Sequence, residues 1–149
     1  MIKKDEIFML EALKEAQKAF SEGEVPVGAV IVQNDSIIGR GHNTVEKEGL
    51  VTCHAEINAI EDASGKAGFM RLSEAEMYVT LEPCPMCAGA ILNSRIKRVV
   101  YGASDKNAGA LGGLIDLSKL QPLKGPYLKT GVMEKECKEL LEKFFRNLR

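Results

Sequence analysis

The chain has 149 residues, of which 45% are hydrophobic and 28% are charged. This composition is typical of a globular protein, and the length predicts one domain over residues 1–149 with a sizeable core. No apolar run is long enough to span a membrane, and the charged start is not typical of a signal peptide, so we expect a cytoplasmic protein with no membrane partner. In that compartment the four cysteines predict metal ligands or redox groups rather than disulfides.

Charge is unevenly distributed along the chain. Residues 1–94 contain 8 Lys and Arg against 15 Asp and Glu, whereas residues 95–149 contain 12 against 6. A basic C-terminal third is compatible with a polyanionic partner such as nucleic acid. Charges spread over solvated faces would give the same numbers, so the asymmetry alone does not decide between the two.

Helices and strands are expected in the order α-β-β-α-β-α-β-β-α. The corresponding residues are 4–20, 25–32, 37–43, 54–65, 76–81, 83–92, 98–102, 127–132 and 134 onward. Residues 44–51 are expected to form a loop. The strand–helix–strand passage from 76 to 102 implies parallel neighbours. This order predicts an α/β domain of three α-β-α layers with a mixed central sheet. The apolar stripe of the last helix is expected to consist of Cys137, Leu140, Leu141, Phe144, Phe145 and Leu148, with core packing for at least one of the two phenylalanines.

Two short stretches carry the chemistry of the chain. Cys53-His54-Ala55-Glu56 offers an imidazole and a carboxylate, and Glu82-Pro83-Cys84-Pro85-Met86-Cys87 offers two thiols in C-x-x-C spacing. At a helix start Cys84 and Cys87 lie on one side, where unpaired N–H groups favour thiolates. With His54 they make three zinc ligands and leave a fourth position open, as catalysis requires. Glu56 is suited to move protons beside such a metal.

Other thiol sites fit parts of this pattern. A lone C-x-x-C also occurs in structural zinc sites and in redox pairs, although a redox pair has no use for His-x-Glu. A structural zinc site needs a fourth strong ligand, and His42 and Cys53 are both candidates, so counting leaves this alternative open. We expect Cys53 to be a small buried residue that points away from the site, and Cys137 to lie in the core.

The combination of His-x-Glu with Pro-Cys-x-x-Cys is the motif pair of zinc deaminases. Further matching stretches lie at 24–30, 41–43, 78–84, 88–91, 94–96, 98–103, 136–137 and 144–146. Over nearly its whole length the chain resembles the bacterial tRNA adenosine deaminases (TadA type) of the cytidine deaminase-like superfamily. The resemblance implies a cytidine deaminase-like fold, a homodimer, one Zn²⁺ per subunit, and deamination of adenosine to inosine at the wobble position (34) of a tRNA anticodon stem-loop.

The resemblance also implies roles for individual residues. His54, Cys84 and Cys87 would hold the metal, and Glu56 would be catalytic. Substrate would be bound by Asn43, Pro26, Val27, Ala55 and Asp105. RNA would be contacted by Lys106, Phe145, Arg146 and Arg149.

The chain departs from its family's pattern in two segments next to the expected substrate. Leu50–Cys53 keeps only the threonine of the usual run before the histidine, and Leu123–Lys129 has no histidine. A deaminase of a free base, nucleoside or nucleotide (guanine, cytosine, cytidine or cytidylate) with the same zinc site is therefore an alternative. An inactive zinc-stabilised binding module is a third, and Glu56 argues against it because a structural zinc site has no use for that carboxylate.

Overall fold

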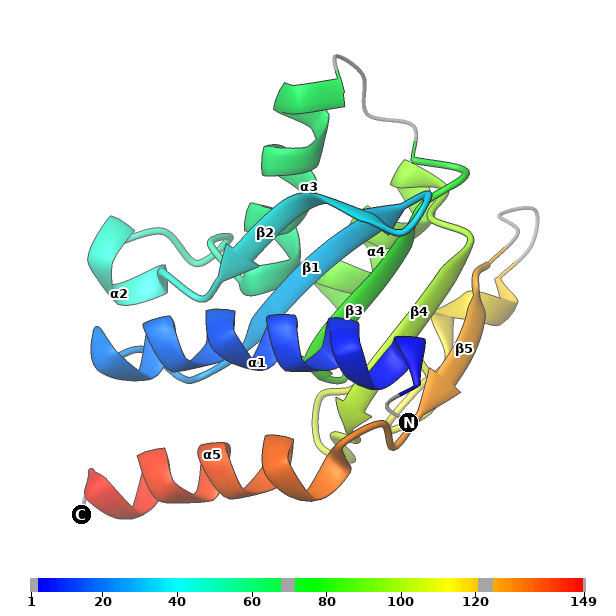
Figure 1. Ribbon diagram of the computed structural model, residues 1–149. Helices are drawn as coiled ribbons and strands as arrows, with labels where there is room; N and C mark the ends of the chain where they lie inside the picture. Colours follow the sequence, from blue (N-terminus) through cyan, green and yellow to red (C-terminus); the bar gives the residue numbers. More distant parts are fainter. Residues whose placement is uncertain (1–2, 68–71, 121–124, 149) are drawn as a thin grey trace.

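The computed structural model describes residues 3–67, 72–120 and 125–148, which include five strands in one mixed sheet (Figure 1). The strand order is β2-β1-β3-β4-β5. The strands are β1 (Gly28–Gln33), β2 (Ser36–His42), β3 (Glu76–Leu81), β4 (Arg98–Ala103) and β5 (Tyr127–Thr130). The helices are α1 (Lys4–Ser21), α2 (Val45–Glu48), α3 (Ala55–Ala67), α4 (Pro85–Ser94), the 3₁₀ helix η1 (Leu117–Lys119) and α5 (Glu134–Asn147). Within these ranges no helix combines the length and apolar character needed to cross a membrane.

Pairing within the sheet changes direction at β3. β1 is antiparallel to both β2 and β3, whereas β3, β4 and β5 are parallel to one another. The parallel pairing of β3 with β4 through α4 confirms the expected crossover. Because parallel strands end at the same edge, the segments after β3 and β4, which begin with Glu82 and Ser104, lie close together.

Helices cover both faces of the sheet, as predicted (Figure 1). Alternate residues of β1 point to opposite faces, which explains why this strand is almost continuously apolar. Ala29 and Ile31 join a core with α3 and α4, while Val30 and Val32 join a second core with α1 and with Cys137 of α5. The residues named in both cores are buried from solvent, and Cys137 lies in one of the cores as expected.

One expectation about the elements was wrong. The segment expected to be a loop at 44–51 contains the short helix α2, which is capped from elsewhere in the fold by Glu24. Along the stripe of α5, Phe144 is buried, in agreement with the expected core packing of at least one phenylalanine, whereas Phe145 and Leu148 are 47% and 68% exposed. The C-terminal half of α5 projects past the sheet, beside the last turns of α1 (Figure 1). Arg149, Leu123 and Lys124 lie outside the described residues.

Candidate active site

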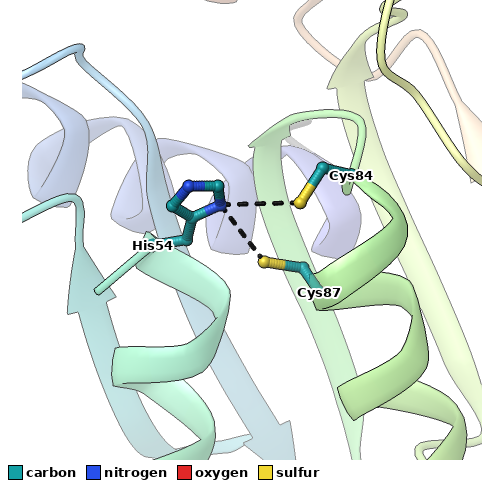
Figure 2. A group of neighbouring side chains, drawn as sticks. All are labelled: His54, Cys84 and Cys87. Carbon is teal, nitrogen blue, oxygen red and sulfur yellow. Dashed lines mark hydrogen bonds between the residues drawn. The ribbon is translucent and has the colours of Figure 1, made fainter. Parts of the chain in front are cut away.

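The beginnings of α3 and α4 bring His54, Cys84 and Cys87 together (Figure 2). His54 directly precedes α3, and Cys84 is the residue before Pro85, which opens α4. Proline suits this first helical position because its missing N–H is not needed there. A Cβ on Gly41 of β2 would overlap the carbonyl oxygen of Ala55, so glycine lets the start of α3 lie directly against the strand.

The geometry of this group fits a tetrahedral metal. The Nδ1 atom of His54 lies 3.6 Å from the sulfur of Cys84 and 3.5 Å from that of Cys87, and the three ligand atoms all lie within 4.8 Å of one another. A zinc ion with bonds of about 2.3 Å to sulfur and about 2.05 Å to nitrogen at the tetrahedral angle separates those atoms by about 3.6 Å. The donor set and the spacing therefore both fit zinc, with a fourth position left open.

The alternative fourth ligands lie elsewhere. The ring nitrogens of His42 lie 3.3 Å from Glu15 and 2.8 Å from Glu22. Cys53 is half-buried rather than buried as expected, and it lines a separate groove with His42. Among the described residues, the group with metal-ligand spacing consists of His54, Cys84 and Cys87. No fourth protein ligand of a structural zinc site is found in that part of the chain.

The two thiols have divergent pKa values in the metal-free chain. A hydrogen bond from Cys87, followed by one from His54, lowers the pKa of Cys84 to about 4. The same bond to Cys84, with burial, raises the pKa of Cys87, and the Cys84 thiolate raises that of His54. Cys84 is thus a thiolate at neutral pH, and metal binding would displace the proton of Cys87.

Glu56 lies in the first turn of α3 and is 3% exposed. Burial raises the pKa of its carboxyl group to about 7, and the nearby Cys84 thiolate acts in the same direction. A carboxyl group that titrates near neutral pH can both accept and return a proton, which is the property required of a general acid–base. Glu56 is outside the group with metal-ligand spacing, as expected.

A cavity of about 230 Å³ opens onto this group. Its volume lies below the range of about 300–1,000 Å³ of drug-sized ligand sites, and it suits one flat base. The lining residues are Val25, Val27, Asn43, His54, Ala55, Glu56, Leu81, Glu82, Cys84, Asp105 and Ala108. Pro26 is buried and is not among them; it lies in a turn in which the Val27 N–H donates to the Val25 carbonyl oxygen at 2.9 Å.

Asn43 is held in the cavity wall by both ends of its amide. Its Nδ2 donates to the carbonyl oxygen of Val25 at 3.3 Å, and its Oδ1 accepts the N–H of Val45 at 3.1 Å. An amide carries two donor hydrogens and two acceptor lone pairs. One N–H and one lone pair of Asn43 therefore remain for a ligand, in a side chain that is already oriented.

Comparison with known proteins assigns this site to a family. The cytidine and deoxycytidylate deaminase zinc-binding region matches residues 2–103. The tRNA-specific adenosine deaminase of Bacillus subtilis (strain 168) is 48% identical over 146 residues, which are 97% of this chain and 91% of that protein. This chain belongs to the tRNA-specific adenosine deaminases. The family assignment made from the sequence is confirmed.

Solved structures of deaminases share the fold. A chain from a study of A-to-I editing by tRNA:A34 deaminases at the wobble position of transfer RNA is 41% identical, with a TM-score of 0.87 over 90% of this chain and 98% of that chain. The guanine deaminase from Nitrosomonas europaea is 23% identical, with a TM-score of 0.78 over 93% and 83%. At that identity the second likeness concerns the fold alone. The expected cytidine deaminase-like fold is confirmed.

A groove of about 440 Å³ continues from the cavity of this deaminase toward α5. The two hollows share Val25, Asn43 and His54, and the far side of the groove is formed by Phe144, Phe145 and Leu148. This placement explains the exposure of Phe145 and Leu148 in the last turns of α5, because these side chains line the groove instead of a core. Lys106 and Arg146 are exposed, and Arg149 lies outside the described residues.

Two carboxylates next to the deaminase cavity were not singled out from the sequence. Glu24, which is 1% exposed, accepts the N–H groups of Glu46 and Lys47 at 2.9 and 2.8 Å and so holds α2. Glu82, which is 3% exposed, accepts three N–H groups of the segment after β4. One signal in the sequence could have indicated that these two residues are buried. Glu24 directly precedes the apolar run that begins at Val25, and Glu82 directly follows the run that ends at Leu81.

Proposed function

We propose that this protein is a zinc-dependent hydrolytic deaminase that converts adenosine to inosine at the wobble position of a tRNA, within the anticodon stem-loop. The observation that carries the proposal is the base-sized cavity lined by His54, Cys84 and Glu56, with Cys87 completing the metal-ligand group beside it. Its membership of the tRNA-specific adenosine deaminases supports the choice of substrate.

His54, Cys84 and Cys87 would hold one zinc ion per subunit, which when bound supplies the Lewis acidity that makes water a nucleophile at neutral pH. Glu56 takes a proton from the attacking water and returns it to the departing amine of the base. A carbon–oxygen bond forms at C6 of adenine as the carbon–nitrogen bond breaks, and ammonia leaves. A pKa near 7 allows Glu56 to do both within one cycle.

The cavity walls would orient the base for this attack. The free N–H and lone pair of Asn43 can pair with one edge of a purine. Val25 and Val27 offer apolar surface, and Asp105 adds a carboxylate to the lining. We further propose that Lys106, Phe145 and Arg146 contact the RNA backbone and a neighbouring base, since Phe145 lies on the groove that continues from the cavity.

We also propose a homodimer built on the outer face of α4. Helix α4 contains no charged residue, and Met86, Gly89 and Ala90 are only half-buried. Leu50 and Val51, in the loop before His54, are 55% and 80% exposed. Exposed apolar surface of this kind is typical of a protein–protein interface. The cytoplasmic location and the single domain expected from the sequence stay predictions.

The test is a comparison of substrates with the zinc-loaded protein. We expect inosine in an anticodon stem-loop with adenosine at the wobble position, measured by nucleoside analysis of the digested RNA. A stem-loop with guanosine there is the matched control. Rapid release of ammonia from free guanine, cytosine, cytidine or cytidylate, with no inosine from the RNA, would refute the proposed substrate and support the alternative deaminase.

A further inference from the structure

The carboxylate of Glu82 is buried at the edge of the cavity, one residue after β3 and two residues before Cys84. In the described part of the chain no Lys, Arg or His nitrogen lies within ion-pair distance of it. A buried carboxylate without a cation is stable only when N–H groups take its lone pairs. The partners that Glu82 has instead are therefore informative about its role.

Those partners all come from one segment, residues 105–113, which follows β4. The Oε1 atom accepts the N–H of Asp105 at 3.0 Å. The Oε2 atom accepts the N–H groups of Leu111 and Gly113 at 3.0 and 2.8 Å. Hydrogen bonds to an ionised acceptor are about twice as strong as neutral ones. One side chain thus fastens both ends of the segment.

The segment is shaped to receive this carboxylate. A Cβ on Gly109 or on Gly113 would overlap the carboxyl group of Glu82 and the carbonyl oxygen of Asp105. Two glycines are therefore needed for the close approach, and this explains part of the glycine-rich composition of the segment. The main chain adds a parallel contact, because the N–H of Ala110 donates to the carbonyl oxygen of Pro83 at 2.8 Å.

The fastened segment carries one wall of the cavity, since Asp105 and Ala108 line it. On the other side of these hydrogen bonds is Glu82 itself, whose main chain leads through Pro83 directly to Cys84. We propose that Glu82 is a positioning residue: its carboxylate fixes the wall at residues 105–108 relative to the metal-binding start of α4, and so sets the fit of the substrate base. This inference rests on the proposed function and adds a residue that acts through its neighbours rather than on the substrate.

The first test is Glu82→Gln in the zinc-loaded protein. An amide has only one oxygen, so if it keeps the two bonds to Leu111 and Gly113, its NH₂ group faces the N–H of Asp105. Loss of one charge-assisted bond predicts a KM for the anticodon stem-loop on the order of tenfold higher, with kcat changed by less than about threefold. Zinc content should stay at the wild-type level. Asp62→Asn is the matched control, because Asp62 also accepts a backbone N–H (Arg40, 2.9 Å) but lies away from the cavity.

A second variant disturbs the same contact from the other side. Gly109→Ala places a methyl group against the Glu82 carboxylate and should raise KM in the same way, whereas Gly65→Ala, which meets no atom within 4 Å, should not. Because both changes open one contact, the KM increase of the double variant Glu82→Gln/Gly109→Ala should be smaller than the product of the two single increases.

The outcomes separate the two proposals. If the wild type forms inosine and both variants keep its KM, the positioning role is refuted. Loss of zinc with an unchanged KM would also refute it, because Glu82 would then support the metal ligands alone. If the wild type instead turns over only a free base or nucleoside, the proposed function fails, and the same KM comparison on that substrate decides the role of Glu82.

Discussion

At the scale of single residues, two buried carboxylates beside one metal group have different surroundings and different tasks. Glu82 is held by three backbone N–H groups and faces the segment that it positions. Burial raises the pKa of Glu56 to about 7, so its charge is easily changed. A group that must move protons needs a pKa near the working pH, whereas a group that holds a loop needs a stable set of hydrogen bonds.

The role of Glu56 is tested by Glu56→Gln, which keeps the size of the side chain and replaces the titratable carboxyl group by an amide that does not titrate near neutral pH. We expect deamination to fall by at least about 10²-fold, because general acid–base catalysis contributes about 10²–10⁴-fold. Zinc content, measured by mass spectrometry of the purified protein, should be unchanged. If the variant loses zinc, Glu56 is a metal ligand, and the assignment of its role is wrong.

The site residues differ in how far the sequence could predict them. His54, Glu56, Cys84 and Cys87 were predictable because their chemistry depends on short spacings at two helix starts. Glu82 was not, because its partners lie 23 to 31 residues further along the chain and become neighbours only when β3 and β4 pair. Pro26 is not among the residues that line the cavity, and its contact with substrate stays a prediction.

At the scale of elements, Asp5 connects α1 to three strands of the sheet, β3, β4 and β5. Its carboxylate accepts two bonds from Arg98 of β4 at 2.8 and 3.0 Å, one from Tyr78 of β3 at 2.8 Å and one from Lys129 of β5 at 2.7 Å. These bonds, chiefly those from Arg98, hold the pKa of Asp5 below its ordinary value of 3.8. One side chain thereby joins a helix to three strands.

We expect Asp5→Asn to lower the free energy of unfolding at pH 7 by about 1.5–3 kcal/mol, because it weakens hydrogen bonds to a partly buried charge. A lowered pKa stabilises the folded state fully above pH 3.8, and this contribution is lost as pH falls through the folded-state pKa. Wild type and variant should therefore converge in acid, as measured by urea unfolding at a series of pH values. Asp35→Asn is the control, since the ion pair of Asp35 with Lys4 is mostly exposed. Equal effects of the two substitutions at pH 7 would contradict this account.

Elements with a strong local pattern were predicted well, and those that depend on distant contacts were not. The boundaries of β3 were correct because the run that ends at Leu81 is followed by Glu82 and then by Pro83. Helix α2 was missed because Val45–Glu48 has no apolar periodicity and is held by Glu24, 22 residues away. The sequence left open whether the end of α5 packs in the core, because periodicity identifies an apolar face but not whether that face meets a core or a groove.

At the scale of the whole molecule, helices α4 and α5, on opposite faces of the sheet, differ in what they present to the outside. The exposed side of α5 carries lysines, two of which form i,i+4 pairs with Glu134 and Glu139. The outer side of α4 has no charge. An uncharged outer helix face of this kind favours contact with protein over contact with water.

The proposed dimer can be tested at Gly89, because a Cβ added there meets no atom of its own chain within 4 Å. Gly89→Glu should therefore leave the fold of one subunit intact, and glutamate is also a better helix former than glycine by roughly 0.5–1 kcal/mol. Placed in an apolar interface, however, its unpaired charge should prevent association. Sedimentation should then give a mass near 16.3 kDa for this variant and about twice that for the wild type. Gln17→Glu, on the exposed side of α1, supplies a control with the same added charge. A Gly89→Glu protein that sediments like the wild type would place the interface elsewhere.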